Sequence, residues 1–213
     1  MNQFLGAVAS ACAAFSATNL DDIIILTLFF AQVNANFRKR HIIIGQYLGF
    51  TVIILASLPG FFSGLVIKRS LIGLLGFLPI IIGIYQLLKL VKTKENDNDQ
   101  IQAVPVTTNQ GNTIFNNLLA PQIYNVAAVT FANGGDNISV YVPLFASTNF
   151  QQLLITLAVF YILIGVWCYL GYFLTRHRGI THIFSKYGHI LAPIVLIGLG
   201  IYILVDSGSL QHM

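Results

Sequence analysis

Three carboxylates stand inside long apolar stretches of this sequence. Asp21 and Asp22 interrupt one stretch and Asp136 interrupts another, and no Lys or Arg lies at a comparable depth to neutralise them. A charged side chain at the centre of a membrane helix costs roughly 2.5–3.5 kcal/mol on insertion scales, so such residues are rare and usually mark an ion or substrate pathway. The sequence therefore predicts that these carboxylates bind a cation inside a membrane.

Asparagine side chains accompany the carboxylates at helical spacing. Asn133, Asp136 and Asn137 fall at i, i+3 and i+4, which is one face of a helix, and Asn19 shares a face with Asp22. Carboxylate and amide oxygens together form the ligand set of a divalent cation. The predicted metal-binding residues are Asn19, Asp21, Asp22, Asn133, Asp136 and Asn137.

Asp21 is the least determined of the predicted ligands. It is adjacent to Asp22 but points about 100° away from it on a helix, so three roles stay open: ligand, support for a ligand, or proton carrier. Gln46 and Tyr47 are weaker candidates to line the pathway.

The composition predicts a membrane protein. Of 213 residues, 56% are apolar and only 8% are charged, against roughly 25% charged in an ordinary soluble domain. Because backbone groups cannot bond to water in hydrocarbon, the spans must be helices. Six candidate spans follow from hydropathy: Phe4 to Val33, His41 to Val66, Leu71 to Val91, Leu118 to Phe145, Leu153 to Leu174, and Ile190 to Val205.

An internal repeat relates the two halves of the chain. Three residue pairs share a separation of 114 positions: Asn19 with Asn133, Asp22 with Asp136, and Pro79 with Pro193. Because each half holds three spans, an odd number, the second half must enter the membrane in the opposite sense. This predicts an all-α polytopic membrane protein of two inverted three-helix repeats, residues 1–92 and 118–213, with a polar cytoplasmic linker at 93–117. Such transporters bind their substrate at the midplane, often where a helix is interrupted, and Gly134 and Gly135 favour an opening of the backbone there.

The basic residues predict the orientation of the spans. Nine of them follow the first, third and fifth spans, and only Lys68 and Arg69 fall on the other side. The positive-inside rule then puts the nine in the cytoplasm and both termini outside. The first Lys or Arg is Arg38, so a charged signal-peptide start is missing and the first span is predicted to be retained.

Other functional classes are disfavoured by what the sequence contains. No G-x-x-x-x-G-K-[S/T] phosphate loop occurs, which argues against an ATP-driven pump. Cys12 and Cys168 lie inside apolar spans, where packing is the main expectation and soft metal ligation the lesser one, and the histidines lie in loops or near span ends rather than in a zinc cage. No enzymatic activity and no cofactor are predicted, the divalent cation being the transported substrate.

At these residues the sequence resembles the CadD-type cadmium-resistance transporters, a branch of the lysine-exporter superfamily. The resemblance covers essentially the whole chain and is carried by Thr18-Asn19-Leu20-Asp21-Asp22, Gly45-Gln46-Tyr47-Leu48-Gly49-Phe50, Pro79-Ile80 and Gly135-Asp136-Asn137. It implies a small permease of the bacterial inner membrane that exports Cd²⁺ or a related divalent ion without ATP.

The resemblance leaves alternatives open. Relatives in the wider superfamily handle manganese, calcium or amino acids, so manganese, zinc and calcium stay as alternative ions. An amino-acid exporter is less favoured, because this chain shows no mid-membrane base to hold a substrate carboxylate. Whether protons are exchanged for the metal, and whether the protein forms a homodimer, also stay open.

Overall fold

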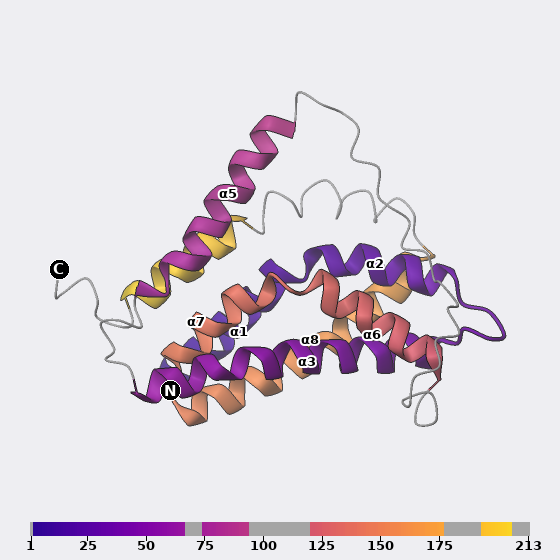
Figure 1. Ribbon diagram of the computed structural model, residues 1–213, viewed down its shortest axis with the longest axis horizontal. Coiled ribbons are helices and arrows are strands. Elements are labelled where there is room, and N and C mark those ends of the chain that lie inside the picture. Colours follow the sequence, from indigo (N-terminus) through magenta and orange to yellow (C-terminus); the bar gives the residue numbers. More distant parts are fainter. Residues whose placement is uncertain (1, 67–73, 94–119, 177–192, 206–213) are drawn as a thin grey trace.

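A computed structural model describes residues 2–66, 74–93, 120–176 and 193–205, and all the regular secondary structure within these ranges is helical (Figure 1). Within these ranges the chain is thus apolar and helical, in agreement with the predicted all-α membrane protein. The linker predicted at 93–117 lies outside the described residues, apart from Thr93. The helices are α1 (Asn2–Thr18), α2 (Leu20–Ala31), α3 (Lys39–Val66), α5 (Phe77–Thr93), α6 (Pro121–Asn133), α7 (Asn137–Ser147), α8 (Phe150–Leu174) and an unlabelled final helix (Pro193–Val205).

Two helices within the described ranges, α3 and α8, are long and apolar enough to cross a membrane alone. The pair α1 and α2 qualifies as a third span when taken together, although its two halves meet at a bend of 59°. The remaining apolar helices are shorter. The count of six spans and their inverted arrangement therefore remain predictions.

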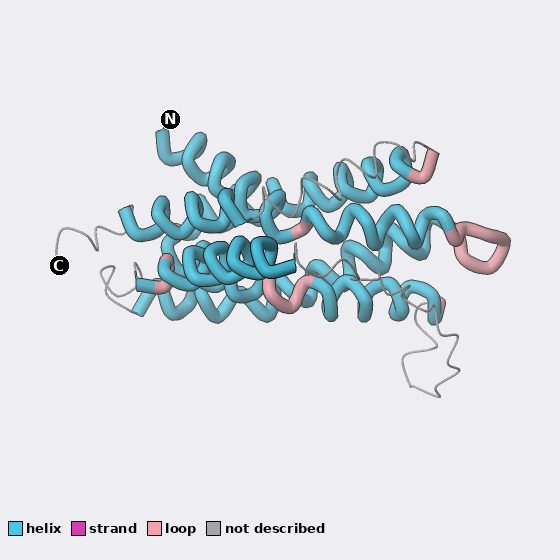
Figure 2. Tube along the Cα trace, turned by 90° about the horizontal axis from the view of Figure 1, so that it is seen from above, coloured by secondary structure: helices cyan, strands magenta, loops and turns pink. Residues whose placement is uncertain are grey.

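Each of the two long helices packs against helices from the other half of the sequence. Helix α3 packs against α6 and α7, whereas α8 packs against α1 and α2. Figure 2 shows that most of the described helices lie lengthwise beside one another. Glycines allow the close approach of α3: a Cβ on Gly45 would lie 2.6 Å from the Val126 Cβ, and a Cβ on Gly49 would lie 2.6 Å from the Ala127 carbonyl oxygen. Gly45 and Gly49, four positions apart, thus allow the close packing typical of small residues at helix interfaces.

Helix α5 and the final helix cross each other beside the main bundle (Figure 1). A Cβ on Gly83 would meet the Ile197 side chain at 2.8 Å, and a Cβ on Gly200 would meet the Ile80 side chain at 2.5 Å. These contacts are reciprocal, with Gly83 and Gly200, like Ile80 and Ile197, 117 positions apart. The spacing exceeds by three positions the 114-residue separation read from the prolines.

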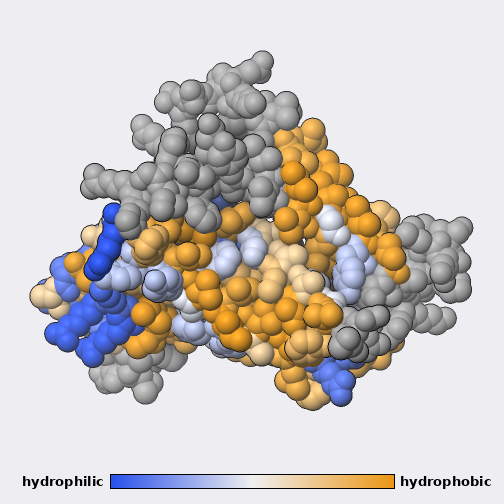
Figure 3. All heavy atoms as spheres, turned by 180° about the vertical axis from the view of Figure 1, so that it is seen from behind, coloured by the Kyte–Doolittle hydropathy of each residue, from blue (hydrophilic) through white to orange (hydrophobic). Residues whose placement is uncertain are grey.

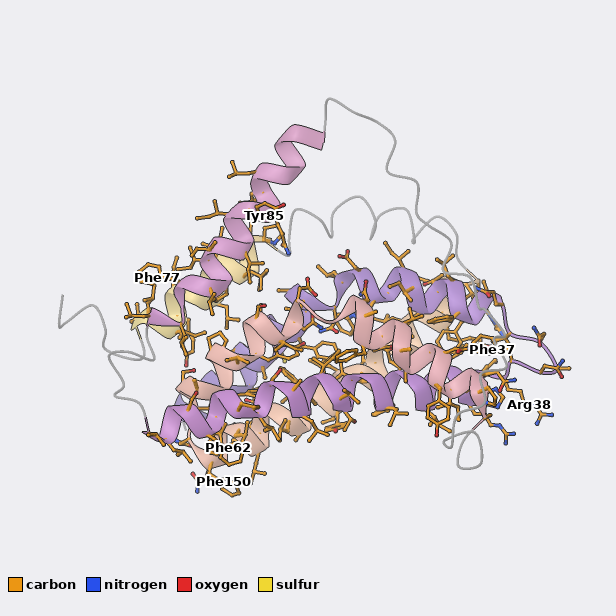
Figure 4. All side chains as sticks on the ribbon, viewed as in Figure 1. Phe37, Arg38, Phe62, Phe77, Tyr85 and Phe150 are labelled. Carbon is orange, nitrogen blue, oxygen red and sulfur yellow. The ribbon has the colours of Figure 1, made fainter. Side chains whose placement is uncertain are left out.

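Basic side chains gather at one end of the bundle. Arg38 lies at this end, while Phe62 and Phe150 lie at the opposite end (Figure 4). Near Arg38, the Lys39 Nζ sits 3.8 Å from the centre of the Tyr172 ring. Apolar surface covers much of the rest of the face shown in Figure 3. This division into an apolar body and a basic end suits a chain embedded in lipid.

Candidate functional site

Two helix breaks lie at the polar motifs of the sequence. Helix α1 ends at Thr18 and α2 begins at Leu20, so that Asn19 stands between them with φ −117° and ψ 14°. Helix α6 ends at Asn133 and α7 begins at Asn137. The second break is the backbone opening predicted at Gly134 and Gly135, which is confirmed.

The break at Asn19 interrupts the predicted span from Phe4 to Val33 and was not predicted from the sequence. Its physical reason is a partner from another helix: the Trp167 Nε1 donates to the Asn19 carbonyl oxygen at 2.7 Å. This bond satisfies a carbonyl at the point where α1 stops. The length of the stretch was an available signal, since 30 helical residues would extend ~45 Å, well beyond a hydrocarbon core of ~30 Å.

The first group of site residues, here called the Asp22 cluster, consists of Asp22, Gln46, Thr130 and Asn133. Asp22 is buried, with 4% of its surface exposed. Its Oδ1 accepts a hydrogen bond from the Asn133 Nδ2 at 2.5 Å, and its Oδ2 accepts one from the Gln46 Nε2 at 3.3 Å. The Thr130 hydroxyl donates to the Gln46 Oε1 at 2.6 Å. The carboxylate is therefore held by two neutral amides that come from α3 and α6.

The second group, the Asn19 cluster, consists of Asn19, Asn137, Tyr141 and Thr18. The Asn19 Nδ2 donates to the Phe15 carbonyl oxygen and to the Tyr141 hydroxyl, both at 2.8 Å. Because the Phe15 carbonyl can only accept, the Asn19 amide has one orientation, and its Oδ1 accepts from the Asn137 Nδ2 at 3.2 Å. The Asn137 Oδ1 is left as the one buried side-chain oxygen or nitrogen within the described ranges that has no hydrogen-bond partner.

The residues Asp21 and Asp136 are exposed at the surface of the protein, whereas Asp22 is buried. Both lie near enough to Asp22 for their charges to act on it, and they also act on each other. Asp21 and Asp22 stand in the first turn of α2, and Asp136 is the N-cap residue of α7. Negative side chains are favoured at helix N-termini by the helix dipole. The three predicted carboxylates thus gather where two half-helices begin.

The six predicted ligands divide between two hydrogen-bonded clusters and two exposed carboxylates. Within the described ranges no group of three or more His, Cys, Asp or Glu side chains is arranged to hold a metal ion. A cation bound at the Asp22 cluster would therefore depend on amide, hydroxyl or backbone oxygens as well as carboxylates. Such oxygens suit hard and intermediate divalent cations.

Sequence reasoning missed three residues that hold the site together: Thr130, Tyr141 and Trp167. Each lies within an apolar run and reaches its partner only through the packing of distant segments. Their polar groups inside apolar spans were the available signal, since a buried hydroxyl or indole N–H needs a partner.

Comparison with known proteins gives one match. A family model described as cadmium resistance transporter matches residues 15–213, a range that contains both helix breaks and both clusters. No curated protein and no solved structure matches the chain.

Proposed function

The chain belongs to the cadmium resistance transporter family, and we propose that it exports a divalent cation, with Cd²⁺ as the first candidate, through the Asp22 cluster. The ion leaves the cytoplasm of a bacterial cell across the inner membrane, without ATP. Manganese, zinc or calcium are the alternative ions, and an amino acid is the less favoured substrate.

The observation that carries this proposal is the surroundings of Asp22. Its carboxylate is buried and contacts two neutral amides, and the negative charges of Asp21 and Asp136 both repel its own negative charge. An arriving divalent cation would compensate this concentration of negative charge. The position between two broken helices also matches the ion sites of other secondary transporters, in which interrupted helices supply backbone oxygens.

The proposed path runs between two inverted repeats, residues 1–92 and 118–213. The crosswise packing of α3 and α8 supports this arrangement, because each long helix packs on the broken pair of the other half. The reciprocal contacts of Gly83 and Gly200 support it as well. Rocking of one repeat against the other would expose the site to each side in turn.

The ligand atoms also bear on which divalent ion is transported. Oxygen-rich sites suit calcium, manganese and ions of similar coordination, whereas zinc sites in proteins usually combine four nitrogen, sulfur or carboxylate ligands. The test is uptake of Cd²⁺, Zn²⁺, Mn²⁺ and Ca²⁺, measured side by side in vesicles containing the purified protein, with protein-free vesicles as the control. We expect Cd²⁺ flux well above the control. The proposal would be contradicted if none of the four ions were taken up, or if the same vesicles took up lysine and no metal ion.

A further inference from the structure

Gln46 belongs to the candidate site because two glycines bring its helix against α6. Gly45 and Gly49 flank it, and a Cβ on Gly49 would lie 2.7 Å from the Thr130 Cβ. The side chain of Gln46 is 5% exposed and spans the distance between Thr130 and Asp22. A long neutral amide is thus buried in direct contact with the carboxylate proposed to receive the cation.

The orientation of this amide follows from its partners. An ionised carboxylate only accepts hydrogen bonds, so the Gln46 Nε2 faces Asp22 and the Gln46 Oε1 faces the Thr130 hydroxyl. A cation on the Asp22 carboxylate would repel the N–H group. The Oε1 of the same amide, by contrast, is a good ligand for a divalent cation.

We propose, on the basis of the function proposed above, that Gln46 is a ligand of the transported cation. Its terminal amide turns over when the ion reaches Asp22, which brings the Oε1 to the metal and the Nε2 to Thr130. Thr130 permits this turn because a hydroxyl both donates and accepts. The hydroxyl donates to the Oε1 in the present arrangement and accepts from the Nε2 in the other, so the amide keeps one buried partner in either orientation.

A glutamine at this position also sets the charge of the site. It adds a ligand oxygen without adding a negative charge to a region where Asp21, Asp22 and Asp136 already act on one another. A ligand from α3 would moreover add a third helix around the ion, beside α2 with Asp22 and α6 with Asn133.

The competing role for Gln46 is that of a hydrogen-bond donor that only positions Asp22. Two substitutions separate the roles. Gln46→Leu removes both functions and avoids methionine, whose thioether is itself a soft ligand for Cd²⁺. Gln46→Glu keeps the shape and the ligand oxygen but loses the amide N–H, so a ligand role tolerates it and a donor role does not.

The experiment is equilibrium dialysis of Cd²⁺ against the purified full-length protein in detergent, with each variant first checked for a single symmetric peak in size-exclusion chromatography. We expect Gln46→Leu to weaken binding about 10- to 100-fold and Gln46→Glu to bind within about 3-fold of the wild type or more tightly. Thr130→Val should weaken binding and Thr130→Ser should preserve it. Ser57→Ala is the matched control on α3, because among the described residues the Ser57 hydroxyl bonds to its own helix alone, at the Ile53 carbonyl oxygen.

The outcomes distinguish this inference from the proposed function. Wild-type affinity in Gln46→Leu, or equal weakening in Gln46→Leu and Gln46→Glu, would overturn the ligand role while leaving the transport proposal standing. Wild-type affinity in Thr130→Val would overturn the proposal that the Gln46 amide turns over while the Thr130 hydroxyl stays its partner. Failure of the wild-type protein to bind Cd²⁺, or unchanged binding in Asp22→Asn, would instead overturn the proposed site itself.

Discussion

Tyr47 on α3 and Tyr161 on α8 stack on each other, with ring centroids 6.2 Å apart and an interplanar angle of 13°. The Tyr47 hydroxyl also donates to the Tyr161 carbonyl oxygen at 3.1 Å. The two residues are 114 positions apart, the same separation as that of Asp22 and Asp136. Equivalent residues of two repeats contact each other only near the axis that relates the repeats, so this contact supports the proposed inverted repeat.

The two equivalent carboxylates have different surroundings on either side of this axis. Asp22 is buried between α3 and α6, whereas Asp136 is exposed. A transporter built from two similar halves needs such an inequality, because a site with identical surroundings on both sides would open equally to both faces of the membrane. The difference also makes the two carboxylates separately testable.

We predict that Asp22→Asn and Asp136→Asn each reduce metal transport about 100-fold or more while leaving the protein folded. For the buried Asp22, loss of one charged ligand from a poorly solvated site is worth roughly 3 kcal/mol, which corresponds to that factor. The exposed Asp136 is expected to follow because its charge acts on the same site. The fold should persist because the Gln46 and Asn133 amides can turn to face a neutral amide at position 22.

The measurement is Cd²⁺ uptake into vesicles together with the amount of each variant in the membrane. Asp97→Asn, in the predicted linker, is the control and should transport normally. Normal transport by both site variants, or their disappearance from the membrane, would show that the carboxylates were assigned the wrong role.

Much of the site was accessible from the sequence because its chemistry is concentrated in two short motifs. Gly134 and Gly135 predicted the break between α6 and α7, since glycine weakens a helix. The break at Asn19 was not predicted, because it depends on a hydrogen bond from Trp167, 148 residues away. The contact of Gln46 with Asp22 likewise depends on how α3 crosses the other helices, which no local pattern encodes.

We predict that a cysteine introduced at Asp97 reacts with a membrane-impermeant maleimide only after the cells are permeabilised. The reason is the excess of Lys and Arg in the loops that follow the odd-numbered spans. Lys39 contacts the Tyr172 ring, and the Tyr172 hydroxyl accepts a hydrogen bond from Arg176 at 2.8 Å. Basic residues next to two of these loops therefore lie at the same end of the bundle, as this orientation requires.

The labelling is done in a background with serine at Cys12 and Cys168, which by itself should give no signal. Labelling of position 97 in intact cells would reverse the assigned orientation.

We predict that Gly60→Ala destabilises the protein by about 1–3 kcal/mol, the usual cost of overpacking. A Cβ at this position would collide with the backbone of Val142 on α7, which cannot move away as a flexible side chain would. Gly198→Ala is the control, because a Cβ there meets nothing within 4 Å; it should be neutral or slightly stabilising through its better helix propensity. Thermal unfolding in detergent measures both, and equal midpoints for the two variants would contradict the close packing of α3 on α7.

We predict that protons compete with the metal at this site. Carboxylates whose charges act on one another, with one of them buried, cannot all stay ionised without a cation, so an arriving metal ion must displace the protons that they hold. The charges of Asp21 and Asp136 both act on the buried Asp22, so this group of carboxylates is where protons and the metal ion are expected to compete.

The measurement is metal-driven proton movement in vesicles at several pH values between about 5.5 and 8, with Asp21→Asn alongside the wild type. Wild-type Cd²⁺ flux should fall as the pH is lowered and should be accompanied by proton movement in the opposite direction. In Asp21→Asn we expect the pH dependence of the metal flux to weaken, because one of the charges that act on Asp22 and Asp136 is removed. Metal flux that is indifferent to pH, with no proton movement, would reject the coupling and leave a uniporter driven by the metal gradient and the membrane potential.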